Sequence, residues 1–133
     1  MTMLDLSYNK EINDKSCRAL RSIFSSKSPI KYLNLDGTSI TQKGFAVIMQ
    51  GTTDNLKVRE ISLQNTRIKI REQDRSRQKV VEALKQNVSL TDLHLDSYRD
   101  DEFFEILQTE LGKNRQIVNI IFPKLLEQEE KAI

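Results

Sequence analysis

The chain has 133 residues, of which 38% are hydrophobic and 30% are charged, a balance typical of one folded domain rather than of a disordered chain. Its 21 basic and 19 acidic residues leave a net charge of only +2, which disfavours a nucleic-acid partner. No apolar run approaches the ~18 residues of a membrane span, no signal peptide opens the chain, and a lone cysteine excludes an internal disulfide, so we expect a cytoplasmic protein.

An apolar frame, LxxLxLxx(N/T)xI, recurs along the chain. Full copies occupy residues 30–40 and 58–68, a third opens at 90–95, a partial copy ends at 4–9, and a degenerate copy lies at 117–122. The second apolar slot of the frame falls at Leu4, Leu33, Ile61, Leu93 and Ile120, so that successive copies are 29, 28, 32 and 27 residues apart. The alternation of apolar and polar residues within each copy predicts a short strand with one buried face.

About 20 residues follow each expected strand, enough for a helix and a return to the sheet. The spacing of apolar residues predicts helices over 14–26, 42–50, 73–86 and 100–111. We expect Thr41 to cap the start of the second helix, and Gly51 and Gly112 to end the second and the fourth. The acidic residues 100–102 suit the positive end of a helix dipole.

A strand–helix unit of this size cannot bury its own apolar face, whereas stacked units bury a continuous core. The sequence therefore predicts a single α/β leucine-rich-repeat domain over residues 1–133, a curved solenoid with parallel strands on its concave side and helices on its convex side. About four to five repeats are expected, at 1–12 (partial), 13–40, 41–68, 69–98 and 99–133.

These repeats resemble the long, helix-bearing leucine-rich repeats of the ribonuclease-inhibitor type. The stretch from Val81 to Leu93 is also similar to the C-terminal repeat domain of tropomodulin, an actin pointed-end capping protein, and this resemblance implies a cytoskeletal role. The fourth copy departs from the frame, with Tyr98 and Asp100 in slots that hold Thr and Ile elsewhere, so its turn is expected to differ.

The two ends of the chain differ in character. The first residues lie within an expected strand, with no polar cap ahead of it. Because solenoids need capped ends, we expect either a fragment of a longer solenoid or a first repeat covered by another chain, with self-association as one outcome. The acidic stretch at 125–131 is interpreted as a closing cap or a frayed tail.

Neighbouring side chains of a strand point to opposite faces of a sheet, so the residues between the buried ones face outward. The full copies place nine candidate binding residues on the concave side: Tyr32, Asn34, Asp36, Glu60, Ser62, Gln64, Asp92, His94 and Asp96. The partial copies add Met3, Asp5, Ser7, Asn119, Ile121 and Pro123. This surface holds five carboxylates and no Lys or Arg, which predicts a partner protein with a basic surface.

Charge is also uneven elsewhere in the chain. Residues 67–79 contain six basic residues and two acidic ones, Glu72 and Asp74, and coincide with the longest repeat. Residues 92–110 contain seven acidic residues and one arginine. The basic run has no interleaved aromatic residues, so a solvated outer face is favoured over a nucleic-acid site.

Two groups of residues are candidates for a catalytic site or a metal site. Cys17 and His94 could form a thiol nucleophile and its base, but the frame places them on opposite sides of the core. His94 between Asp92 and Asp96 could hold a metal, but ligands from a single strand diverge, and a surface histidine whose charged form is favoured by its neighbouring carboxylates is the simpler interpretation. We therefore predict no enzymatic activity, no metal and no cofactor.

Binding of another protein through the acidic concave sheet is the function that these observations favour. Two alternatives stay open: an actin-binding or cytoskeletal cap like tropomodulin, and a structural or sensor segment of a larger multidomain protein.

Overall fold

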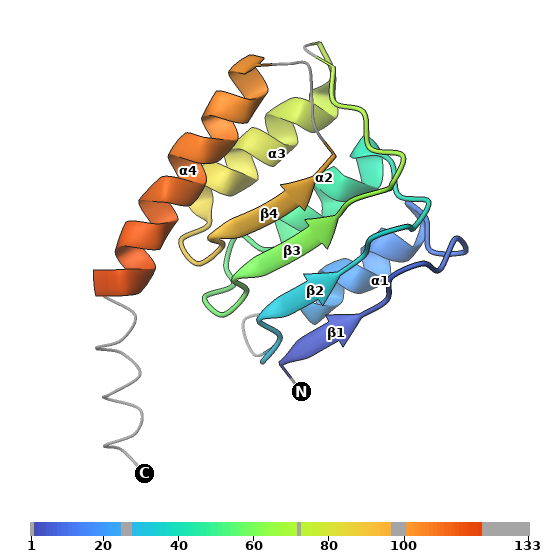
Figure 1. The fold of residues 1–133 in the computed structure, drawn as a ribbon, viewed down its shortest axis with the longest axis horizontal. Coiled ribbons are helices and arrows are strands. Elements are labelled where there is room, and N and C mark those ends of the chain that lie inside the picture. Colours follow the sequence, from blue (N-terminus) through green and yellow to red (C-terminus); the bar gives the residue numbers. More distant parts are fainter. Residues whose placement is uncertain (1, 25–27, 72, 97–100, 121–133) are drawn as a thin grey trace.

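The computed structural model describes residues 2–24, 28–71, 73–96 and 101–120. Four strand–helix units follow one another along the chain, and the helices lie on one side of the strands (Figure 1). The strands are β1 (Met3–Asp5), β2 (Tyr32–Asn34), β3 (Glu60–Leu63) and β4 (Asp92–Leu95). The helices are α1 (Ser16–Ile23), α2 (Gln42–Gly51), α3 (Arg75–Gln86) and α4 (Asp101–Ile120).

The four strands form one parallel sheet in the order β1-β2-β3-β4. Leu4 pairs with Leu33, Leu33 with Ile61, and Ile61 with Leu93. These are the second apolar slots of the repeat frame, so the predicted register of the strands is confirmed for the first four copies. The α/β leucine-rich-repeat fold with parallel strands is confirmed with them.

The apolar slots of the inner strands point into the core against the helices. Leu33 and Leu35 of the second copy and Ile61 and Leu63 of the third are at most 2% exposed, as predicted. Leu93 and Leu95 were predicted to be equally buried, but they are only partly buried. The difference arises because β4, like β1, is an edge strand of the described sheet. Self-association through β1 stays a prediction.

The turns after β1, β2 and β3 pass through a left-handed backbone conformation at the same position of the frame. Tyr8, Gly37 and Asn65 have φ angles of 59°, 69° and 57°. Asparagine and glycine adopt this region at little cost, whereas tyrosine does so with strain. At Gly37 a side chain is excluded by contact as well, because an added Cβ would lie 2.5 Å from Cδ1 of Tyr8.

The polar slot of the frame closes each of these turns. Nδ2 of Asn9 donates to the carbonyl of Leu6 at 3.0 Å, and the hydroxyls of Thr38 and Thr66 donate to the equivalent carbonyls of Leu35 and Leu63, at 2.8 and 3.0 Å. Either Asn or Thr serves in this slot, since both side chains can donate to the carbonyl three residues earlier, at the end of the strand or just after it.

Side chains cap the helices and also join one repeat to the next. Thr41 caps α2 as predicted, and its Oγ1 accepts from the backbone N–H of Lys43 at 3.3 Å. The carboxylate of Asp14, one repeat earlier, accepts from the backbone N–H of Thr41 and that of Gly44. Gly51 ends α2 as predicted, while α1 and α3 start two residues later than expected.

Buried asparagines support the return from helix to strand. Oδ1 of Asn55 accepts from the backbone N–H groups of Lys57 and Val58, both at 2.7 Å, and its Nδ2 donates to the carbonyl of Phe24 in the preceding repeat. Asn87 repeats this pattern one unit later, accepting from Ser89 and Leu90. Each side chain thus shapes its own loop and also binds the neighbouring repeat.

The end of the described chain differs from the prediction. Helix α4 continues through Gly112 to Ile120, so Gly112 does not end it, and residues 117–120, including Asn119, are helical instead of forming a fifth strand. A helical glycine costs only about 1 kcal/mol relative to alanine, and burial of Leu107 and Leu111 on the inner side of α4 offsets that cost. The turn expected at Tyr98 and Asp100, the residues Ile121 and Pro123, and the tail at 125–131 lie outside the described residues.

Candidate functional site

The register of the sheet sets the outward residues in two rows on its open face, the face without helices. Met3, Tyr32, Glu60 and Asp92 form one row, and Asp5, Asn34, Ser62 and His94 form the next. Asp36, Gln64 and Asp96 follow at the ends of the strands. All nine candidate residues of the full copies therefore share one continuous face, as the alternation of the strands predicts.

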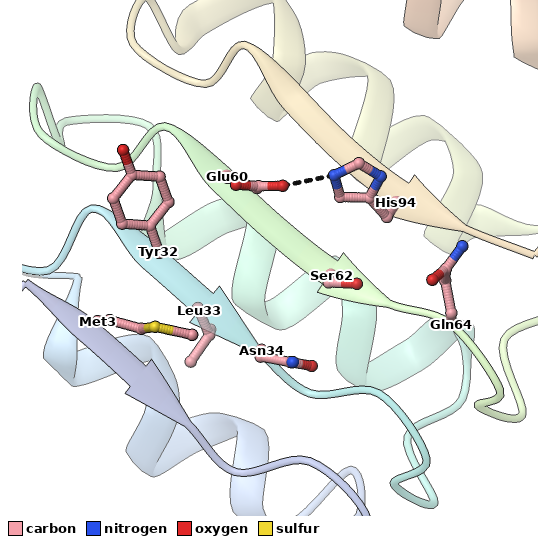
Figure 2. Close-up of a pocket in the computed structure, with 8 residues that line it drawn as sticks. All are labelled: Met3, Tyr32, Leu33, Asn34, Glu60, Ser62, Gln64 and His94. Atoms are coloured by element: carbon pink, nitrogen blue, oxygen red, sulfur yellow. Dashed lines mark hydrogen bonds and ion pairs between the residues drawn. The ribbon is translucent and has the colours of Figure 1, made fainter.

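A shallow pocket of about 300 Å³ is hollowed into the middle of this open face (Figure 2). Eight residues from all four strands line it: Met3, Tyr32, Leu33, Asn34, Glu60, Ser62, Gln64 and His94. Met3 and Tyr32 remain 53% and 41% exposed, so an apolar side chain and an aromatic ring stand free at the side of the pocket formed by β1 and β2. Such residues commonly anchor a bound protein.

The carboxylates of the open face already have hydrogen-bond donors within the chain. Oδ1 of Asp36 accepts from the hydroxyl of Ser62 at 2.6 Å and from the backbone N–H of Gln64 at 2.7 Å. Both carboxylate oxygens of Asp96 accept from the backbone N–H of Asn65, at 3.0 and 3.1 Å. These two side chains hold the turns at the strand ends, a structural role that the repeat frame does not reveal.

The same is true in the first strand. The backbone N–H of Ser7 donates to Oδ1 of Asp5 at 3.0 Å. Hydrogen bonds from the side chain and the backbone of Ser7 lower the pKa of Asp5, because they favour its charged form.

His94 is paired with the neighbouring strand. Its Nε2 lies 2.6 Å from Oε1 of Glu60, and both side chains are more than 40% exposed (Figure 2). Glu60 pairs with Asp92 in the register and is therefore a diagonal neighbour of His94, a carboxylate that the sequence did not indicate beside Asp92 and Asp96. At this exposure the pair contributes little to stability.

Asp92 has a basic neighbour that the sequence did not indicate. Nη2 of Arg115 lies 3.4 Å from Oδ1 of Asp92, and the hydroxyl of Thr91 donates to the other carboxylate oxygen. Arg115 reaches this position because α4 continues beyond Gly112, where the sequence predicted that the helix would end. The outward strand residues themselves still include no Lys or Arg, and α4 supplies this basic neighbour.

The structure forms neither the candidate catalytic pair nor a metal site within the described residues. Cys17 is completely buried on α1, and burial, with a smaller contribution from Asp14, raises the pKa of its thiol to about 12. His94 stands on the opposite side of the sheet, so the two cannot act as nucleophile and base. Within the described ranges, the structure contains no group of three His, Cys, Asp or Glu residues that could hold a metal ion. No helix of the described part is long and apolar enough to cross a membrane.

Comparison with known proteins identifies solved structures that have a similar fold. No protein-family description matches the sequence, and no curated protein matches it. Among solved structures, actin-binding site 2 of leiomodin-1 superposes with a TM-score of 0.74 at 17% identity, over 100% of this chain and 90% of that one. The C-terminal domain of tropomodulin from Caenorhabditis elegans gives 0.72 at 17% identity, over 90% of this chain and 87% of that one.

Both neighbours have this arrangement of strands and helices over nearly their whole length, which confirms the expected similarity to the tropomodulin repeat domain at the level of the fold. The more specific assignment to the ribonuclease-inhibitor type stays a prediction. The chain is thus a leucine-rich-repeat-like α/β domain with the architecture of the tropomodulin and leiomodin domains.

Proposed function

We propose that this chain is a protein-binding module and that its partner is actin. The observation that carries the proposal is the superposition of the entire chain on a leiomodin-1 domain that is itself an actin-binding site. The similarity spans every repeat rather than a single motif, and the second neighbour comes from tropomodulin. Because a fold alone does not establish a function, the proposal needs a surface and a direct test.

The surface that we propose is the open face of the sheet, defined by the nine candidate residues together with Met3. It offers a pocket of about 300 Å³ with free apolar and aromatic side chains beside it, Met3 and Tyr32. A protein that docks here would bury these two side chains against its own surface, which is the usual source of binding energy in protein interfaces.

Charge on the open face would select the part of the partner that lies over it. Asp5, Asp36, Glu60 and Asp96 place carboxylates on this face, and their oxygens accept hydrogen bonds from within the chain. We therefore propose that basic residues of the partner face these rows. Since the carboxylates are already paired, their contribution should appear mainly in the association rate and in its dependence on salt.

Binding to actin and the use of the open face can be tested in one series. Wild-type protein and the double variant Met3→Ala/Tyr32→Ala would be mixed with filamentous actin and sedimented, and mixed with labelled monomeric actin for fluorescence anisotropy. The matched control is Leu56→Ala/Phe104→Ala, because these side chains are 53% and 54% exposed but lie outside the strands.

We expect the wild type and the control to bind one form of actin equally well, and the open-face variant to bind at least about tenfold more weakly. Absence of any wild-type binding to either form would overturn actin as the partner. Equal binding by all three proteins would retain actin and reject the open face.

A further inference from the structure

The segment between β3 and α3 carries a regular series of basic side chains. Arg67, Lys69 and Arg71 are exposed, whereas the intervening Ile68 and Ile70 are 8% and 6% exposed and belong to the core. The alternation shows an extended stretch with its isoleucines inward and its bases outward. In such a stretch the α-carbons of Arg67, Lys69 and Arg71 follow one another at about 6.5 Å.

The segment is held in place by the preceding repeat. The backbone N–H of Arg67 donates to the carbonyl of Ile40 at 3.0 Å, and the backbone N–H of Lys69 is 3.4 Å from Oε1 of Gln42. These bonds set the segment beside the start of α2, where Lys43 is exposed, and the segment leads into Arg75, exposed at the start of α3. We call Lys43, Arg67, Lys69, Arg71 and Arg75 the basic rim.

The bases of the basic rim have no partners among the residues that the structure describes. Arg77, His94, Lys113 and Arg115, which form ion pairs in that part of the chain, do not belong to the basic rim. Asp74, the nearest acidic residue along the segment, accepts from the backbone N–H of Ser76 as the cap of α3. Glu72 lies outside the described residues. The basic rim thus contrasts with the open face, where every carboxylate accepts a hydrogen bond from this chain.

We infer that the basic rim is an interaction surface for an acidic segment of a partner protein. A polypeptide in extended conformation repeats its side chains at the same spacing as the three bases, so carboxylates at alternate positions could pair with Arg67, Lys69 and Arg71 together. Rigid placement of the segment lowers the entropy that such pairing would cost.

A protein fits this surface better than a nucleic acid does. The negative open face begins at the strand ends, where Asp36 and Asp96 lie, and it would repel a uniform polyanion that extends past the basic rim. Proteins that bind single-stranded nucleic acids also place aromatic side chains among their basic residues, and nucleobases stack on these rings. Residues 67–75 contain no aromatic residue. A partner of mixed charge, acidic over the basic rim and basic over the open face, satisfies both surfaces.

This inference deepens the proposed function, since the same partner would contact both surfaces, but it can be tested separately. The probe is a fluorescein-labelled oligoglutamate peptide of fifteen residues, with a labelled DNA duplex of equal charge as comparison. The rim variant is Arg67→Gln/Lys69→Gln/Arg71→Gln. The matched control, Arg18→Gln/Lys57→Gln/Lys85→Gln, removes the same charge from other exposed positions. Thermal melting verifies that both variants fold.

At low salt we expect the rim variant to bind the peptide about tenfold more weakly than the wild type, the effect of losing three exposed ion pairs, and the control to stay within about twofold. Equal losses in both variants would overturn the inference, because only net charge would then matter. Tighter, rim-dependent binding of the DNA would overturn it in favour of a nucleic acid.

Actin separates the two proposals. Rim-dependent binding of the peptide without any binding of actin would retain the basic rim and reject actin. Actin binding that is unchanged in the rim variant, together with peptide binding that does not depend on the rim, would retain actin and reject the basic rim.

Discussion

The loop from α3 to β4 and helix α4 each contain an asparagine at the same position of the repeat, in a loop backbone in one case and in a helical backbone in the other. Asn87 lies three residues before the buried Leu90, and Asn114 lies three residues before Ile117, so both occupy the same position of the repeat. Both side chains are completely buried, and both donate through Nδ2 to the preceding repeat, Asn87 to the carbonyl of Thr52 and Asn114 to that of Leu90.

Their Oδ1 atoms differ. That of Asn87 accepts from the backbone N–H groups of Ser89 and Leu90, which the loop turns toward it. That of Asn114 has no hydrogen-bond partner among the described residues, because helix α4 continues and its backbone N–H groups bond along the helix. A residue can therefore keep the burial and the donor hydrogen bond typical of its repeat position even where the backbone is helical and no longer forms the loop of the repeat.

The largest expected effect compares an inner strand with the edge strand of the described sheet. Leu63→Ala should lower the free energy of unfolding by about 2–5 kcal/mol, because it leaves a cavity in a fully buried site. Leu95→Ala, at the equivalent but partly buried position, should cost roughly half as much. Urea denaturation measures both. Equal losses would mean that β4 is as well covered as β3.

The two asparagines give the next comparison. Asn87→Ala removes four hydrogen bonds, one of them from Asn114, and leaves buried backbone groups without partners, so we expect a loss of about 2–3 kcal/mol in the free energy of unfolding. Asn114→Ala removes donors but also an unpaired acceptor, and should cost at most about 1 kcal/mol. The same denaturation curves compare the two. A larger loss at Asn114 would show that its Oδ1 has a partner in solution.

Two glycines should respond with opposite signs. Gly37→Ala should destabilise the domain by about 1–2 kcal/mol, since the left-handed backbone and the nearby ring of Tyr8 both oppose a side chain. Gly112→Ala should stabilise it by about 0.5–1 kcal/mol, because alanine favours the helix and nothing lies within 4 Å of the added Cβ. Melting temperatures of the two variants suffice. A destabilising Gly112→Ala would contradict a helix that continues through this position.

The smallest effect concerns the thiol of Cys17. Burial raises its pKa to about 12, so ionisation favours the unfolded chain once the pH exceeds the thiol's ordinary pKa. The stabilisation is complete below that ordinary value and is lost as the pH rises toward 12. We expect alkylation by iodoacetamide at pH 8 to be slow in the folded protein and fast in urea. Rapid alkylation of the native state would show that α1 opens.

Most of the fold could be predicted because the apolar slots repeat in register and each strand alternates. The same alternation placed all nine candidate residues on one face. The pairing of His94 with Glu60 could not be predicted, since the sequence frame assigns faces but not partners across the rungs. Asp36 and Asp96 accept backbone N–H groups at the strand ends. This role depends on the geometry of the turns, which cannot be predicted from the presence of an acidic residue.

The error at the end of the chain has a single physical origin. Residues 117–122 fit the apolar frame, which predicts a strand there. The frame does not indicate, however, whether the preceding helix ends before this strand. Gly112 suggested an end, yet a glycine is tolerated inside a helix whose inner side is buried, and α4 continues. The position of Arg115 beside Asp92 follows from that continuation and was missed for the same reason.

The most direct test of the central claim maps the contact surface with isotopically labelled protein. Backbone amide resonances would be recorded with and without monomeric actin at low salt. The proposed function predicts that a complex forms and that resonances of Tyr32, Ser62 and His94 shift or broaden while those of the outer side of α1 do not. Absence of a complex, or changes confined to the helices, would contradict it.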